Sequence, residues 1–115
     1  MILIVSEAKN AAQCIPVIQK MTGERVQLAP TMRPALAMLR SREFSVVLVD
    51  QACLEQGASF ADALWKNAGT AIPLTANFAI HNAERIAREV RSALLRRDRD
   101  RVLAAASQRT PCAMN

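Results

Sequence analysis

The sequence predicts an α/β protein, a three-layer α/β/α sandwich built on a short parallel sheet of about four strands. Two apolar runs carry this prediction, Met1-Ile-Leu-Ile-Val-Ser6 and Ser45-Val-Val-Leu-Val-Asp50, because such runs are typical of strands buried on both faces. Helix-like stretches lie between and after them, as expected when parallel strands are joined by helical crossovers. The expected strand order is 2-1-3-4, followed by a long C-terminal helix.

Length and composition limit the class of protein. The chain has 115 residues, 51% of them apolar and 22% charged, which fits one folded domain with a single core. Only 3% are aromatic, so the core is expected to be aliphatic. No apolar stretch reaches the length of a membrane span, and no basic segment precedes the first strand. We therefore expect a cytoplasmic protein without a signal peptide or a membrane partner.

The first part of the chain alternates between strand and helix signals. A strand is predicted over 2–5 and a helix over 8–22, which Gly23 ends in a left-handed turn. Pro16 lies within that stretch and predicts a kink or a late helix start. A second strand is predicted over 25–28.

The middle of the chain repeats this alternation. Thr31 is expected to cap a second helix, with Pro34 tolerated in its first turn. The third strand is predicted over 45–50, and it is followed by a loop over 51–59 and a helix over 60–67.

One more strand and a long helix complete the predicted fold. The strand spans 72–75, and Pro73, which cannot donate a ladder hydrogen bond, favours a strand start or an edge position. One amphipathic helix is predicted over 82–107, followed by frayed residues. The chain is thereby divided into a domain over 1–97 and a basic helical extension with a frayed end over 98–115.

The formal net charge of +5 is concentrated in the C-terminal part of the chain. Residues 1–80 contain seven Lys/Arg and six Asp/Glu, whereas residues 81–115 contain eight Arg and four acids. An arginine-rich helix is compatible with a small nucleic-acid-binding regulator. However, pairs such as Glu84 with Arg88 are typical of a solvated helix, and no aromatic residues alternate with the arginines for base stacking. We therefore favour a solvated or dimerising helix over one that binds nucleic acid.

Residues that usually carry catalysis or hold zinc are sparse. Cys14, Cys53 and Cys112 are scattered, and His81 is the only histidine, which argues against a Cys/His zinc site. The cysteines are expected to be reduced thiols that mostly serve packing, and His81 to be solvated. The sequence contains no Gly-rich phosphate loop, nucleophile-base pair or metal cluster, so we do not expect an enzyme with its own substrate.

Acidic and hydroxyl residues stand where the predicted strands end. Ser6 and Glu7 follow the first strand, Asp50 ends the third and Thr75 ends the fourth. In open α/β sheets, ligands bind beyond the carboxyl ends of the strands. We therefore expect Ser6, Glu7 and Asp50 to lie together at one edge of the sheet.

In order, these segments resemble a response-regulator receiver domain, a family with a flavodoxin-like fold. Ile2-Leu-Ile-Val-Ser-Glu7 is similar to that family's first strand. Phe44-Ser-Val-Val-Leu-Val-Asp50 is similar to the third, whose final Asp accepts a phosphoryl group. Ile72-Pro-Leu-Thr-Ala76 is similar to the fourth, and the resemblance spans roughly residues 1–95.

The resemblance implies that Asp50 is the phosphoacceptor, that Glu7 and Asp50 hold Mg²⁺, and that Thr75 is the switch residue. Each residue also has an ordinary structural interpretation. Asp50 can be explained as a hydrogen-bond acceptor in the following loop, Glu7 as a helix-dipole partner and Thr75 as a β-branched strand residue. The chain departs from the family at Ser6, which replaces an acid, and in lacking a fifth strand that ends in Lys-Pro. Aspartyl phosphorylation needs a carboxylate, a divalent cation and groups that neutralise developing charge, so we expect it to be impaired.

About one strand-helix unit of the family is absent after Thr75. Either 72–76 corresponds to the family's fourth strand and the fifth is missing, or 74–78 corresponds to the fifth. In both cases one edge strand of the sheet and some apolar surface are left exposed to solvent. We therefore expect a homodimer formed through residues 72–107.

The predicted function is a receiver-like signalling module of a bacterial two-component-type pathway. It would act by protein–protein contact with a histidine kinase or a downstream regulator, and Asp50 would be an impaired or vestigial phosphoacceptor. The alternatives are a competent Mg²⁺-dependent phosphoacceptor receiver and a nucleic-acid-binding regulator that uses the arginine-rich helix.

Overall fold

A four-stranded parallel sheet with the order β2-β1-β3-β4 forms the centre of the protein, which confirms the predicted α/β class and strand order. The structure is a computed structural model that describes the backbone of residues 1–55 and 58–113 and the side chains of residues 1–55 and 61–103. The strands are β1 (Ile2–Val5), β2 (Val26–Ala29), β3 (Val46–Asp50) and β4 (Ile72–Ala76). The helices are α1 (Ala11–Thr22), α2 (Met32–Ser41), α3 (Gln51–Leu54), α4 (Ala58–Asn67) and α5 (Ala83–Ala113).

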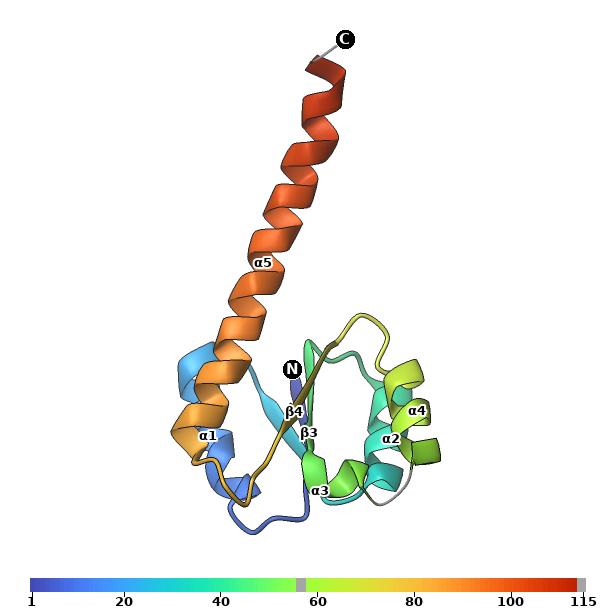
Figure 1. Ribbon diagram of the computed structural model, residues 1–115, viewed down its shortest axis with the longest axis vertical. Coiled ribbons are helices and arrows are strands. Elements are labelled where there is room, and N and C mark those ends of the chain that lie inside the picture. Colours follow the sequence, from blue (N-terminus) through green and yellow to red (C-terminus); the bar gives the residue numbers. More distant parts are fainter. Residues whose placement is uncertain (56–57, 114–115) are drawn as a thin grey trace.

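Helices cover the sheet on its two faces. Helices α1 and α5 lie side by side against one face, and α2 and α4 lie against the other (Figure 1). Alternate residues of β1 and β3 enter two separate cores, as expected for strands buried on both faces. The largest buried side chains on the α1/α5 face are Ile2, Ile4, Ile18, Leu48, Phe78 and Ile86. Those on the α2/α4 face include Leu3, Leu39, Phe44 and Leu64.

Strand β4 forms one edge of the sheet. The Ile72 N–H donates to the Ser45 carbonyl at 2.9 Å, so the backbone groups of Ile72 point toward β3. Successive residues of a strand direct these groups to opposite sides, and Pro73 therefore faces the open edge, where a missing N–H costs no ladder hydrogen bond. The edge position predicted from this proline is confirmed.

Helix α1 begins later than the predicted range, at Ala11, and Pro16 lies within it. The helix runs through this proline, so the late start expected at Pro16 is not what the structure shows. The start at Ala11 follows a turn in which the Ser6 hydroxyl accepts the Ala8 N–H at 3.1 Å and the Ala8 carbonyl accepts the Ala11 N–H. The predicted end is confirmed, because Gly23 adopts a φ of 73° and its N–H donates to the Gln19 carbonyl.

The segment after β3 differs from the predicted loop over 51–59. The Asp50 side chain accepts the Ala52 N–H and caps the single turn of α3, after which α4 starts at Ala58 instead of residue 60. Thr31 occupies the predicted N-cap position of α2, but its side chain makes no capping hydrogen bond.

Helix α5 is longer than predicted. Its backbone continues past residue 107 to Ala113, so the expected domain boundary at 97/98 falls within one continuous helix. The first half of α5 packs against α1, and the second half extends away from the rest of the protein (Figure 1). Among the described residues, no helix combines the length and the apolar character needed to cross a membrane.

Truncation of Ile86 tests how strongly α5 is held to the sheet. Ile86 is fully buried, so Ile86→Ala should lower the free energy of unfolding by about 2–5 kcal/mol through lost burial and a cavity. Urea denaturation at a fixed protein concentration measures this. Ile80 is 75% exposed, and the same change there should cost less than about 0.5 kcal/mol. Equal losses in the two variants would contradict the described packing of α5.

Candidate functional site

Ser6 and Asp50 meet at the carboxyl ends of β1 and β3. These strands are neighbours and run parallel, so the residues that follow their last ladder pair, Val5 with Val49, emerge side by side. The Ser6 hydroxyl donates to Oδ2 of Asp50 at 2.7 Å. Oδ1 of Asp50 accepts the Ala52 N–H at 3.2 Å. The structure thus brings together two of the three residues expected at this edge and gives each Asp50 oxygen a donor from the protein.

The Asp50 carboxylate is almost completely enclosed. Asp50 is 4% exposed and Ser6 is 2% exposed. A buried carboxylate without hydrogen bonds would be strongly destabilising, and hydrogen bonds to its charged form offset that cost. Ser6 also accepts the Ala8 N–H, so its hydroxyl connects the turn after β1 to the end of β3.

Glu7 is exposed after β1, and Cys53 is buried in α3, three residues after Asp50. Burial raises the pKa of the Cys53 thiol, and the charges of Asp50 and Glu7 raise it further, while a backbone hydrogen bond at Glu7 lowers it. Both carboxylates therefore act on the thiol through their charges. The sequence analysis treated Cys53 only as a packing residue. Its position in the single turn capped by Asp50 places it at the site, and that turn was not predicted.

Thr75 is not part of this hydrogen-bonded group. In the register of β3 and β4, Thr75 lies opposite Val49, and the residue opposite Asp50 is Ala76. Thr75 is exposed, whereas Ala76 is buried and has no hydroxyl. Among the described hydrogen bonds, none connects Thr75 to Asp50.

The acids at this edge offer few ligands for a magnesium ion. Mg²⁺ is usually held by one or two carboxylates together with water and phosphate oxygens. Glu7 and Asp50 supply two carboxylates, and the part of the chain that the structure describes contains no group of three or more His, Cys, Asp or Glu arranged to hold a metal. Because Ser6 already donates to Asp50, the two acids fit Mg²⁺ only through Glu7 and the remaining lone pairs of Asp50.

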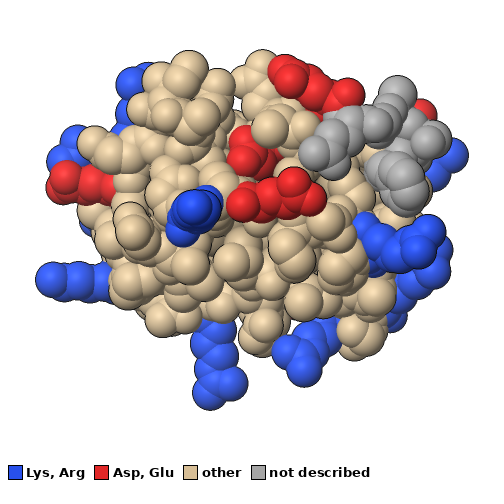
Figure 2. Space-filling view, turned by 90° about the horizontal axis from the view of Figure 1, so that it is seen from below, with Lys and Arg blue, Asp and Glu red and all other residues tan. Residues whose placement is uncertain are grey.

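Charge is unevenly distributed on the face that contains the carboxyl ends of the strands. Figure 2 shows acidic side chains close together near the middle of this face and basic side chains mostly toward its periphery. The chain as a whole carries a formal charge of +5. This end of the sheet therefore has a local acidic centre in a basic protein, which is the kind of surface that attracts a cation or a basic partner.

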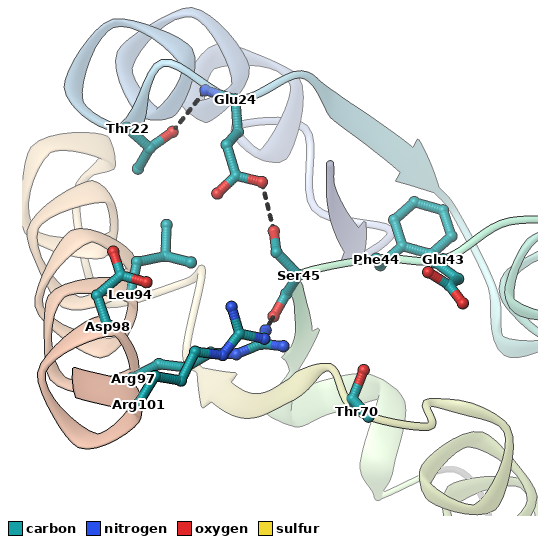
Figure 3. A pocket seen from close by; sticks show the side chains of 10 residues that line it. All are labelled: Thr22, Glu24, Glu43, Phe44, Ser45, Thr70, Leu94, Arg97, Asp98 and Arg101. Atoms are coloured by element: carbon teal, nitrogen blue, oxygen red, sulfur yellow. Dashed lines mark hydrogen bonds between the residues drawn. The ribbon is translucent and has the colours of Figure 1, made fainter. Parts of the chain in front are cut away.

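A second polar group lies at the opposite end of the sheet, in a pocket of about 450 Å³ between α5 and the amino ends of the strands (Figure 3). Nη1 of Arg97 donates to the Ser45 carbonyl at 3.1 Å, and the Ser45 hydroxyl donates to Glu24. The Met1 amino group lies 2.7 Å from Glu24. Burial alone would raise the pKa of Glu24, but these hydrogen bonds and the nearby positive charges lower it overall. The group joins α5 to the sheet through residues far apart in sequence, and sequence analysis did not identify it.

His81 differs from its predicted solvated state. Its side chain is partly buried, and Nδ1 is enclosed without a hydrogen-bond partner among the described residues. The cause is the turn after β4, in which the N–H groups of Ile80 and His81 both donate to the Asn77 carbonyl. This turn leaves Ile80 exposed and places His81 partly inside.

Comparisons with protein-family models, with curated proteins and with solved structures found no match for this chain.

Removal of the Ser6 hydroxyl tests its role at Asp50. Ser6→Ala leaves a buried carboxylate oxygen without its donor, so the free energy of unfolding should fall by about 1–3 kcal/mol. Ser92→Ala, the same change at an exposed position of α5, should alter it by less than about 0.5 kcal/mol. Urea denaturation of both variants gives the comparison. If Ser6→Ala lowers the free energy of unfolding by the same amount in an Asp50→Ala background as in the wild type, the Ser6–Asp50 hydrogen bond is not the cause of the loss.

Proposed function

We propose that this protein is a receiver-like signalling module in which Asp50 is an impaired or vestigial phosphoacceptor. It acts by protein–protein contact in a two-component-type pathway, in the cytoplasm, with a histidine kinase or a downstream regulator as partner. The fold behind this proposal is a three-layer α/β/α sandwich of the flavodoxin-like type, supported by the strand order and by the helices on both faces of the sheet. The observation that carries the proposal is the buried Ser6–Asp50 hydrogen bond.

Impairment follows from what surrounds the Asp50 carboxylate. A nucleophilic carboxylate must reach the phosphorus atom of a donor, and this one is 4% exposed with both oxygens hydrogen-bonded. Ser6 contributes a neutral hydroxyl in place of an acid, which removes one negative charge that would attract a divalent cation. The lysines of the chain are Lys9, Lys20 and Lys66, and none follows β4 to neutralise a phosphoryl group.

In this proposal Thr75 is a surface residue near the site and does not act as a switch residue. A switch residue must hydrogen-bond the phosphoryl group, and the position level with Asp50 on β4 is Ala76. Glu7 is an exposed carboxylate that could bind Mg²⁺ together with Asp50. In the alternative, a competent receiver, Asp50 would exchange the Ser6 hydroxyl for the cation.

Ser6→Asp distinguishes the impaired from the competent receiver. The variant restores an acid beside Asp50, so incubation with Mg²⁺ and acetyl phosphate should phosphorylate it several-fold faster than the wild type, as measured by intact mass. Asp50→Asn in the Ser6→Asp background should abolish the added mass. Wild-type labelling as fast as that of Ser6→Asp would favour the competent receiver. No labelling of a folded Ser6→Asp variant would contradict the assignment of Asp50 as phosphoacceptor.

We also propose that the protein forms a homodimer through residues 72–107. Strand β4 leaves one edge of the sheet open, and Leu95, Val102 and Leu103 of α5 are exposed apolar residues. Nucleic acid is not the partner in this proposal. Two arginines of α5 already form ion pairs at helical spacing, Arg88 with Glu84 and Arg85 with Glu89.

Light scattering coupled to size-exclusion chromatography tests the homodimer. The expected result is a mass near twice that of the 12.6 kDa chain, which falls on dilution. A monomer mass at every concentration into the high micromolar range would contradict it. The absorbance ratio at 260 and 280 nm serves as a control, because a mass carried by bound nucleic acid would favour the nucleic-acid alternative.

A further inference from the structure

We propose that two copies associate by antiparallel pairing of their α5 helices, with Leu103 of each copy entering a groove between β4 and α5 of the other. This inference rests on the homodimer proposed above. It adds the surface, the register and the residues that select a second copy as the partner.

The groove has a volume of about 640 Å³ and lies along the edge strand where β4 meets α5. Ile72 and Leu74 of β4 and Ala93 of α5 give it an apolar part. Ile72 and Leu74 pack against the core of the protein but are only partly buried. An apolar surface beside an uncovered sheet edge is a site where a further apolar side chain is stabilised by burial. The charged residues that line it all come from α5, and they are Arg96, Arg97, Asp100 and Arg101.

A stripe along α5 continues the groove toward the free end of the helix. The stripe consists of Ala93, Arg96, Asp100 and Leu103, whose separations of three and four residues keep them on one side of a helix. The first three line the groove, and Leu103, which is 58% exposed, lies beyond it. The buried Ala93, 4% exposed, thus forms the floor of the groove at one end of the stripe, Leu103 stands at the other end, and two opposite charges stand between them.

This stripe is complementary to itself when two copies run antiparallel. Ala93 then lies opposite Leu103 of the second copy, and Arg96 lies opposite its Asp100. Both pairs fall in one register, because each is centred on residue 98. A two-fold axis repeats every contact, which gives two apolar contacts and two interhelical ion pairs. Neither Arg96 nor Asp100 forms an ion pair within the described part of the chain, so both charges are available.

The residue at the centre of this register does not oppose the pairing. Two Asp98 side chains facing each other would repel. However, Asp98 is two positions from both Arg96 and Asp100 and points to a different side of the helix. It lines the pocket at the amino ends of the strands instead. The axis therefore passes between the two helices without a like-charge contact at Asp98.

The pairing also gives the free half of α5 a surface to pack on. This half extends away from its own sheet (Figure 1). Most helices in proteins owe their stability to packing of one face. In the antiparallel dimer, the free half of each helix lies along the groove of the other copy. Leu103 of one copy and Ile72 and Leu74 of the other are then buried against each other.

Charge reversal tests the register. Asp100→Arg places Arg96 opposite an arginine twice in the dimer, so the dissociation constant from sedimentation equilibrium should rise at least about tenfold. Arg96→Asp should do the same. The double reversal Arg96→Asp/Asp100→Arg restores both pairs and should return the constant to within about threefold of the wild type. Glu84→Arg disrupts an ion pair of α5 away from the groove and should leave the constant unchanged.

Two apolar positions one residue apart test which side of α5 is buried. Leu103→Gln should raise the dissociation constant at least about tenfold, because Leu103 enters the groove. Val102→Gln should leave it within about threefold of the wild type, although Val102 is 68% exposed and equally close to the free end. Circular dichroism of each variant controls for loss of helix.

The outcomes separate this inference from the proposals on which it rests. Two results would contradict this interface but not the homodimer. One is a dissociation constant that neither charge reversal changes. The other is a dimer that Val102→Gln weakens and Leu103→Gln does not. A wild-type chain that is monomeric at every concentration overturns both the interface and the homodimer. The phosphorylation of Ser6→Asp does not depend on either result.

Discussion

The buried Asp50 carboxylate is the constraint around which this protein is organised. A charged group that is almost completely enclosed must receive hydrogen bonds, and the chain provides them from two places. The parallel pairing of β1 with β3 brings the Ser6 hydroxyl to one oxygen. The turn that follows β3 brings the Ala52 N–H to the other. The turn after β1 and the short helix α3 are therefore linked through one side chain.

The same contacts limit what the carboxylate can do. Hydrogen bonds to its charged form stabilise the folded chain, but they also occupy the oxygens that would attack phosphorus or bind a cation. Ser6 is central to this balance, because an acid in its place would repel Asp50 and would be held there only with a cation between them. With serine at this position, Asp50 receives a hydrogen bond in place of a like charge, and this supports the proposal of a module that works through its surface.

The parts of the fold that could be predicted from the sequence are those set by local chemistry. The apolar runs identified β1 and β3, Gly23 marked the end of α1, and Pro73 marked an edge strand. The parts that could not be predicted depend on contacts distant in sequence or on a small shift of register. The contact of Arg97 with Ser45 joins residues 52 positions apart. Thr75 stands one residue away from the position opposite Asp50, and a sequence motif cannot detect a shift of that size.

The open edge of the sheet decides how a second molecule can attach. Addition of another strand to β4 would use backbone groups that face outward, and at Pro73 the outward position has no N–H to donate. Edge-to-edge pairing of two sheets is therefore weakened near the start of β4. Side-chain packing beside the edge is not weakened by the proline, because Ile72 and Leu74 remain partly exposed next to α5. An edge strand that carries a proline and a last helix that continues far beyond the sheet therefore both support the proposed association through α5.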